Sequence, residues 1–568
     1  MKTQGNNSTT IFLKILLTSL FLVFFLFVFK NISYPLIWND ESESVMVGDR
    51  ILEYGYPKVH DGKNAIFMSY APDIKDENGK LVGYKEKHDA YIYMTWGNYY
   101  WAAIGVYLAK FTDDIYLKTA LLRIPFAIMG LLGLMLFAST AKMFFLNHKH
   151  RIIFLVLFVF FELFSISLIL HMREARYFSL VIFMTACFFY IYSNYFLFKK
   201  LSAIKYYIVM TILLFSSFHV NFISFGIFSA TLALSRGGAF LNNIIYHPKE
   251  FKNEFVSLLK SAIPIFISFI LIYPFLIFFE IYKNSTIISQ YLGFTFDSYK
   301  TNLGLIYEYL TNLEFGNIFL LVKAIWLIFW LYIPSTKKNK YPAIDALQKF
   351  SFFAISFFII YILIISRTPY LFVRHYIVLQ PIMIIIMIID VFILFYYYRL
   401  LQKDIVSKAL FVYLLFLPIF FVFNTINKIK FIKGHIYEIT HQYKGVLDYV
   451  IPYIQQNFKN PENLIIATNY EGFSYIYYLK SKVTIGFIDR ELEAKYNPDI
   501  IIYRKYWVGD ESKYITFMQK EKYRKISFPV VDYPLNNIPE LDYAIKHLFE
   551  TKIASNEQEQ TDIYIKTN

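Results

Sequence analysis

The chain has 568 residues, of which 57% are hydrophobic and only 17% charged, whereas soluble domains usually carry about 25% charged residues. Its single cysteine, Cys187, excludes a disulfide framework and a cysteine-based metal site. The formal net charge is +14, but the basic residues stand mostly in short stretches between apolar runs. That distribution is typical of a membrane orientation signal and not of a groove that follows nucleic acid phosphates.

Apolar runs predict eleven membrane spans. The first extends from about Ile11 to Val28, and about 20 apolar residues suffice to cross a bilayer as a helix. Because no small-residue cleavage site follows it, we expect a retained anchor. The other ten lie near 120–141, 153–170, 177–198, 206–218, 221–235, 261–281, 317–334, 350–366, 376–397 and 409–425. Since the segments 206–218 and 221–235 are nearly continuous, the sequence leaves open whether they form one helix or two.

The charge of the loops predicts the orientation of these spans. With a cytoplasmic N-terminus, every predicted cytoplasmic loop is rich in Lys or Arg, as the positive-inside rule requires. Counting 91–109 as a further span would place the basic loops outside. We therefore expect this Trp- and Tyr-rich segment to be a helix in the membrane interface. The outer face then carries a long first loop, about 32–118.

The composition of the chain changes near residue 425, where the long apolar runs end. Beyond it, strand-like runs at 463–468 and 498–503 alternate with helical patterns such as 444–457. A length of about 140 residues is normal for an independent domain. The sequence therefore predicts a polytopic α-helical domain over 1–425 and a small α/β extracytoplasmic domain over 426–568.

An acidic pair, Asp40 and Glu41, closely follows the first span. Carboxylates so close to lipid are costly unless they have a partner or a function. The residues after them show the pattern of an amphipathic helix that begins at the pair. The acids can simply stabilise a helix N-terminus. The functional alternative is that a carboxylate serves as general base for an acceptor hydroxyl or amine.

Basic residues gather on the same predicted outer face. Arg173 and Arg176 stand at i and i+3, so a helical turn would present both on one side. Arginines on this face run against the positive-inside rule, and several together favour a bound phosphate or diphosphate. The alternative is that they pair with Glu174 or Glu162, or snorkel from helix ends. The further candidates on this face are Lys85, His88, Asp89, Arg123, Arg374 and His375.

Metal and nucleotide motifs are weak or missing. No two of the histidines expected outside have HxH or HxxxH spacing, and a lone histidine is more often a structural residue. The sequence contains no P-loop, GxGxxG, GxSxG or HExxH. It predicts no cofactor with certainty and leaves a divalent metal open.

Five stretches carry a family resemblance. They are NDESESVMVGDRILEYGYP (39–57), KHDAYIYMTWGNYYWAAIGVYLAKF (87–111), LLRIPFAIMGLLG (121–133), REARYFSL (173–180) and VRHYIVLQP (373–381). In this order they resemble the GT-C glycosyltransferases that use lipid-linked sugars, the group of the protein O-mannosyltransferases and the lipid A aminoarabinose transferase. One departure is His88-Asp89-Ala90-Tyr91, which stands where relatives have prolines and puts the acceptor side of the site in doubt.

The resemblance implies a GT-C fold and an inverting transfer from a polyprenyl-phosphate sugar at the outer face of the cytoplasmic membrane. The acceptor is a lipid such as lipid A, a glycan or a protein, and no nucleic acid is involved. Asp40 would act as base, and Glu41 would orient or bind. Arginines such as Arg173, Arg176 and Arg374 would hold the donor phosphate. The matched motifs add Tyr177 and Tyr376 to the substrate-binding set.

Rival functions predict other patterns. A transporter or flippase of lipid-linked sugars tends to show internal repeats and spans broken by Gly or Pro in mid-membrane. A polysaccharide polymerase or ligase usually places its basic residues in a large mid-chain outer loop, whereas here the long loop is the first. A scaffold would leave the acidic pair and the arginines without a shared purpose. The sequence thus favours a glycosyltransferase, with its sugar and acceptor undetermined.

Overall fold

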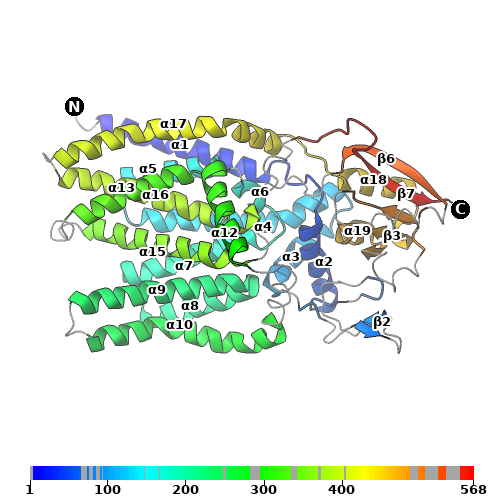
Figure 1. Cartoon of the computed structure of the whole chain (residues 1–568), viewed down its shortest axis with the longest axis horizontal. Coiled ribbons are helices and arrows are strands. Elements are labelled where there is room, and N and C mark those ends of the chain that lie inside the picture. Colours follow the sequence, from blue (N-terminus) through cyan, green and yellow to red (C-terminus); the bar gives the residue numbers. More distant parts are fainter. Residues whose placement is uncertain are drawn as a thin grey trace.

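The structure is a computed structural model in which long helices run side by side and a small sheet forms one end (Figure 1). It describes residues 4–59, 61–64, 73–75, 81–84, 90–92, 94–145, 147–165, 167–246, 251–281, 295–333, 342–368, 372–401, 405–485, 497–505, 518, 522–532 and 550–567.

A helix occupies each of the eleven predicted spans. These helices are α1 (Gln4–Phe29), α4 (Ile115–Lys142), α5 (His148–Leu163), α7 (Phe178–Tyr192), α8 (Ala203–Val220), α9 (Phe222–Tyr246), α10 (Phe251–Phe278), α13 (Gly316–Tyr332), α15 (Pro342–Ile365), α16 (Leu379–Leu400) and α17 (Ile405–Thr440). Short segments join them: α6 (Leu168–Met172), η1 (Ser193–Leu197), α12 (Phe296–Glu308), η3 (Tyr309–Leu313) and η4 (Val373–His375).

Length and composition identify the membrane helices within the described residues. Nine are long and apolar enough to cross a membrane, and the pair Phe296–Leu313 and Gly316–Tyr332, bent by 99°, makes ten if it counts as one span. Helix α5 has only 16 residues, which is short of the about 20 that a span needs. The chain is therefore a multi-pass membrane protein, and its described residues include nine or ten such helices, close to the eleven expected.

The stretch 203–246 forms two helices, which answers the question that the sequence left open. Asn221 separates α8 from α9 with extended backbone, and its Oδ1 accepts a hydrogen bond from the Ile223 N–H at 3.0 Å. This contact caps the start of α9. Helices α8, α9 and α10 pack against one another (Figure 1).

The first predicted outer loop contains two packed helices. Helix α2 (Asn39–Tyr54) begins at the acidic pair, as predicted, and α3 (Gly97–Ala109) has 13 residues, too few for a span. The two helices touch closely at Gly48, where a Cβ would lie 2.9 Å from the Ala103 nitrogen. Glycine is required for this approach, which fixes α2 against α3. A two-stranded sheet, β1 (Asp73–Lys75) with β2 (Leu81–Tyr84), lies between them in sequence.

The C-terminal part forms a five-stranded sheet in the order β4-β3-β5-β7-β6. Its elements are α18 (Leu447–Asn457), η5 (Pro461–Asn463), β3 (Ile465–Thr468), α19 (Gly472–Leu479), β4 (Lys482–Ile485), β5 (Ile500–Ile502), β6 (Tyr523–Val531) and β7 (Gln560–Lys566). Strands β4, β3 and β5 are parallel, and β7 and β6 continue the sheet antiparallel. Helix α17 continues across residue 425 to Thr440, so the sheet-bearing part starts beyond that helix.

Candidate active site

Asp40 stands in the first turn of α2, where the helix dipole favours a carboxylate. Its Oδ2 lies 3.2 Å from Arg374 Nη2 and 3.8 Å from Arg176 Nη2. The Asp40 side chain is 21% exposed, while both arginine side chains are buried. Burial pushes the pKa of Asp40 up, but Arg176 and Arg374 outweigh burial and hold it below its ordinary value. Asp40 is therefore an ionised carboxylate that solvent can reach.

A second carboxylate, Glu43, shares Arg176 with Asp40. Arg176 Nη1 lies 3.4 Å from Glu43 Oε2 and donates to the Asp40 carbonyl at 3.1 Å. Glu43 Oε1 accepts from the hydroxyls of Tyr91 and Tyr99 at 2.8 and 2.7 Å. Glu43 was not among the residues predicted from the sequence, although its i+3 spacing from Asp40 places both side chains on one helix face.

Glu41 and Arg123 form a buried pair. Arg123 Nε and Nη2 donate to the two Glu41 oxygens at 2.8 and 2.6 Å, and the Ala175 N–H donates to Glu41 Oε1 at 2.9 Å. Arg123 Nη1 also donates to the carbonyls of Ile32 and Pro35. The pair thus ties the start of α2 to α4 and to the turn before α7. This geometry is that of positioning residues, because their polar atoms are engaged with the protein itself.

Arg173 and Arg176 have different partners, although they are only three positions apart in the sequence. The residues 173–177 between α6 and α7 are turns and bends rather than a helical turn. Arg173 Nη1 donates to the Lys30 carbonyl at 2.9 Å, and burial, followed by the charge of Arg123, lowers the pKa of Arg173 to about 10. Of these two arginines, Arg176 is the one that contacts Asp40 in the described part of the chain. The two arginines therefore serve two separate parts of the site.

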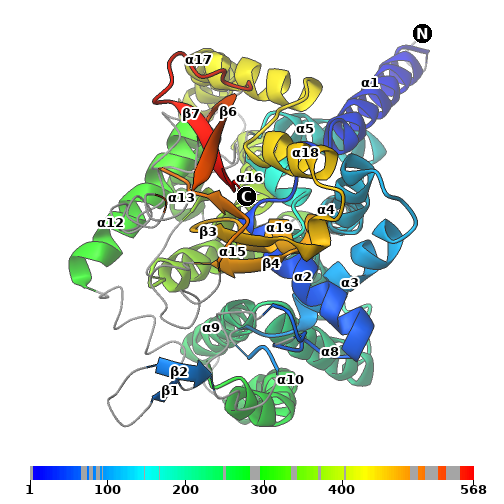
Figure 2. The ribbon, with the colours of Figure 1, turned by 90° about the vertical axis from the view of Figure 1, so that its right-hand side faces the viewer.

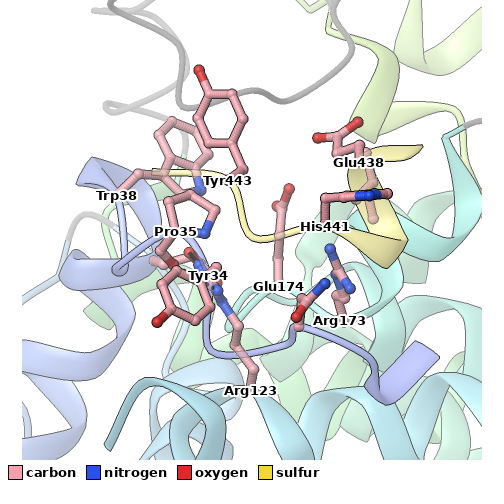
Figure 3. Close-up of a pocket in the computed structure, with 12 residues that line it drawn as sticks. Tyr34, Pro35, Trp38, Arg123, Arg173, Glu174, Glu438, His441 and Tyr443 are labelled. Carbon is pink, nitrogen blue, oxygen red and sulfur yellow. Dashed lines mark hydrogen bonds and ion pairs between the residues drawn. The ribbon is translucent and has the colours of Figure 1, made fainter. Parts of the chain in front are cut away.

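Figure 3 shows the pocket that Arg173 lines. Trp38 stands on one side, Glu438 of α17 and His441 just after that helix stand on the other, and Glu174 points in between them. Arg123 and Glu41 contribute to its lining, together with Asn31, Tyr34, Pro35, Leu170 and Tyr443. Trp38 lies between this pocket and the Asp40 cluster, which consists of Asp40, Glu43, Arg176 and Arg374. Its ring is 5.0 Å from the guanidinium of Arg374.

Glu174 is a buried carboxyl group within this pocket. Its Oε1 lies 2.8 Å from His171 Nδ1, and its Oε2 has no hydrogen-bond partner among the described residues. Burial, and after it the charge of Glu41, raises the pKa of Glu174 well above its ordinary value. A neutral carboxyl group can donate a hydrogen bond to a ligand in the pocket.

The remaining predicted residues lie at different depths. Tyr177 is close to the cluster, with its ring 5.6 Å from the Arg176 guanidinium. His375 is next to Arg374 in η4, and burial, followed by that arginine, lowers the pKa of His375 to about 3. His375 is thus neutral at physiological pH. Tyr376, the next residue in the chain, is fully buried.

Three predicted residues, Lys85, His88 and Asp89, lie outside the described residues. Across the part of the chain that the structure describes, no three His, Cys, Asp or Glu side chains are grouped to hold a metal ion.

A bundle of membrane-length helices, an acid-led helix after the first span and a terminal sheet make up the fold of this chain. The solved structure of ArnT from Cupriavidus metallidurans in the apo state is similar to this chain, with a TM-score of 0.50 at 10% identity over 98% of both chains. ArnT from the same organism bound to undecaprenyl phosphate gives a TM-score of 0.47 with the same identity and coverage. No protein-family model matches the chain, and neither does a curated protein. The fold expected from the five motifs is thereby confirmed.

Proposed function

We propose that this chain is an inverting glycosyltransferase that moves a sugar from a polyprenyl-phosphate donor to a lipid, glycan or protein acceptor. The reaction takes place at the outer face of the cytoplasmic membrane, with the N-terminus inside and the terminal sheet outside. One observation carries the proposal: Asp40 is an ionised, partly exposed carboxylate held between two buried guanidinium groups. The GT-C fold and the order of the five sequence motifs support the same class.

The donor phosphate is assigned to the Arg173 pocket. Among the described residues, Arg173 uses one guanidinium N–H for the Lys30 carbonyl, and a guanidinium has five donors in a fork that matches phosphate oxygens. Trp38 separates this pocket from Arg374 and lines it with an aromatic surface. A sugar attached to a phosphate in the pocket can extend past Trp38 toward Asp40.

Asp40 acts as the general base in this scheme. The acceptor O–H or N–H loses its proton to Asp40 while its lone pair forms the bond to the anomeric carbon. The bond from that carbon to the phosphate oxygen breaks, and the oxygen leaves with the electron pair as polyprenyl phosphate. Attack opposite the leaving group inverts the anomeric centre. Because phosphate is a good leaving group, the arginines need only stabilise its charge.

The alternative functions are a transporter or flippase of lipid-linked sugars and a polysaccharide polymerase or ligase. A transporter needs no base, so an ionised carboxylate held by two arginines favours transfer chemistry. A polymerase would use the same chemistry with a growing glycan as its acceptor, so that the identity of the acceptor distinguishes the two.

Mass spectrometry of lipids and envelope glycans tests the proposal. Cells carrying wild type, a deletion, Asp40→Asn or Asp113→Asn are compared at equal membrane levels of protein. Asp113 is a matched control because it is a fully exposed acid in the same outer segment. We expect one glycosylated species to disappear in the deletion and in Asp40→Asn, while a polyprenyl-phosphate sugar accumulates. A normal profile in Asp40→Asn with a changed profile in the deletion overturns the assignment of the base.

A further inference from the structure

A second pocket lies where α19 packs against α2 (Figure 2). We name it the α2–α19 pocket. Its volume is about 310 Å³, within the range of small-molecule sites. One face of α2 lines it at positions three and four residues apart, namely Met46, Asp49, Arg50, Glu53 and Tyr54. Ile476 and Tyr477 of α19 line it as well. The first predicted outer loop and the C-terminal part therefore form this pocket together.

Contacts between α2 and α19 hold two of its walls. Ser474 Oγ of α19 donates to the Ile37 carbonyl, just before α2, at 2.8 Å. Lys480 Nζ, at the end of α19, lies 2.8 Å from Asp49 Oδ2. Lys63 Nζ donates to the Lys480 carbonyl at 2.6 Å. The two helices are thus fixed against each other at both ends of α19.

Arg50 holds the third wall, which is the segment that follows α2. Its Nη2 donates to Asp61 Oδ2 at 2.9 Å and to the Asn64 carbonyl at 2.8 Å, and its Nη1 donates to the Lys58 carbonyl at 2.8 Å. Asn64 Nδ2 in turn donates to the Ser481 carbonyl at 2.9 Å. Because all three walls are bonded to one another, the pocket is preformed.

The charges of the lining are largely engaged with the protein itself. Four acids and three basic residues line the pocket. Lys480 pairs with Asp49, Arg50 pairs with Asp61, and the Lys63 ammonium donates to backbone carbonyls. Since these cations already have acceptors, the pocket is a poor site for a phosphate, which needs free donors. An acyl chain is excluded too, because it would cover charged groups without hydrogen bonding to them.

Two exposed carboxylates remain for a ligand. Glu53 and Glu462 line the pocket and form no ion pair among the described residues. The half-buried ring of Tyr54 and the ring of Tyr477 add aromatic surface. Hydroxyl groups donate to carboxylates, and C–H groups pack against aromatic rings. A neutral molecule with many hydroxyl groups satisfies both kinds of lining, and sugars have this chemistry.

We propose that the α2–α19 pocket binds a sugar unit of a glycan-bearing acceptor. Met46 stands three positions after Glu43, so the pocket begins on the turn of α2 that follows the Asp40 cluster. The six residues from Asp40 to Met46 correspond to about 9 Å along the helix axis. A glycan with one unit in the pocket can therefore present a neighbouring unit to Asp40. The inference rests on the proposed function, and it selects the glycan among the possible acceptors.

Calorimetric titration of released glycan tests the site apart from catalysis. The probe is the oligosaccharide fraction that mild acid releases from the envelope of deletion cells, and the protein is full-length Asp40→Asn, which lacks the proposed base. We expect binding that Glu462→Ala in this background weakens roughly 10-fold in apparent Kd, because a hydrogen bond to a charged group is lost. Tyr54→Ala should weaken it about 5-fold through the lost ring contact.

The matched control is Glu550→Ala. Glu550 is an exposed acid of the C-terminal part that does not line the pocket, so the apparent Kd should not change. Equal melting temperatures of the variants exclude misfolding. Absence of binding to Asp40→Asn, or the same Kd in Glu462→Ala as in Glu550→Ala, overturns the inference.

Steady-state kinetics then connects the pocket to transfer. The donor is the polyprenyl-phosphate sugar extracted from Asp40→Asn cells, and the acceptor is washed envelope from deletion cells, titrated by mass. Glu462→Ala should raise the acceptor KM roughly 10-fold and leave the donor KM within about twofold; equal rises of both would contradict an acceptor site. If wild type transfers no sugar while Glu462→Ala still loses glycan binding, the proposed function fails and the glycan-binding site stands.

Discussion

Arg374 Nη2 lies 3.2 Å from Asp40 Oδ2, although 334 residues separate the two in sequence. The contact joins the start of α2 to η4, so Asp40 and Arg374 come from opposite ends of the helical part of the sequence. In the absence of donor, Arg374 and Arg176 offset the charge of Asp40.

Arg374→Gln is therefore predicted to lower kcat about 100-fold, because Asp40 loses the guanidinium that holds its carboxylate in place. Arg367→Gln is the matched control, since Arg367 is an exposed arginine in the same segment between α15 and α16. The rate of sugar transfer at saturating donor is the measurement. Equal activities of the two variants would argue against a role for Arg374 in transfer.

The pH dependence of transfer should report the ionisation of Asp40. A carboxylate is a base only above its pKa, and Arg176 and Arg374 hold the pKa of Asp40 below the ordinary value of 3.8. Activity in wild type should therefore fall only below that pH. In Arg176→Gln the pKa of Asp40 rises, so the acidic limb of kcat/KM should move to higher pH. An unmoved limb would show that another group limits the rate.

Sequence patterns predicted the helices well for a physical reason. Each apolar run has to be a helix in lipid, because the backbone cannot otherwise satisfy its hydrogen bonds. The same reasoning placed the start of α2 at Asp40. The continuation of α17 past 425 was not predicted, because polar residues such as Asn424 end a hydropathic run without ending a helix.

The site itself was less predictable, since its contacts are long-range. The i+3 rule grouped Arg173 with Arg176, but the Lys30 carbonyl holds Arg173 in another pocket. Glu43 is held by the hydroxyls of Tyr91 and Tyr99, which lie 48 and 56 residues later in the sequence. The contact between α19 and Ile37 spans 437 residues, and no local pattern in the sequence indicates it.

The buried pair of Glu41 and Arg123 should determine stability more than chemistry. Glu41→Gln leaves Arg123 buried with one partner charge removed, which costs about 3–5 kcal/mol, so the melting temperature in detergent should fall clearly. Asp345→Asn breaks an exposed pair with Lys349 and should change stability by at most about 0.5 kcal/mol. If Glu41→Gln has a normal melting temperature but has lost sugar transfer, Glu41 has a direct catalytic role.

Arg173 should act on the donor and not on the acceptor. Arg173→Gln is predicted to raise the donor KM roughly 10-fold or more, because a charge-assisted hydrogen bond to phosphate is lost, with the acceptor KM unchanged. A rise of the acceptor KM in Arg173→Gln would instead assign the pocket of Figure 3 to the acceptor.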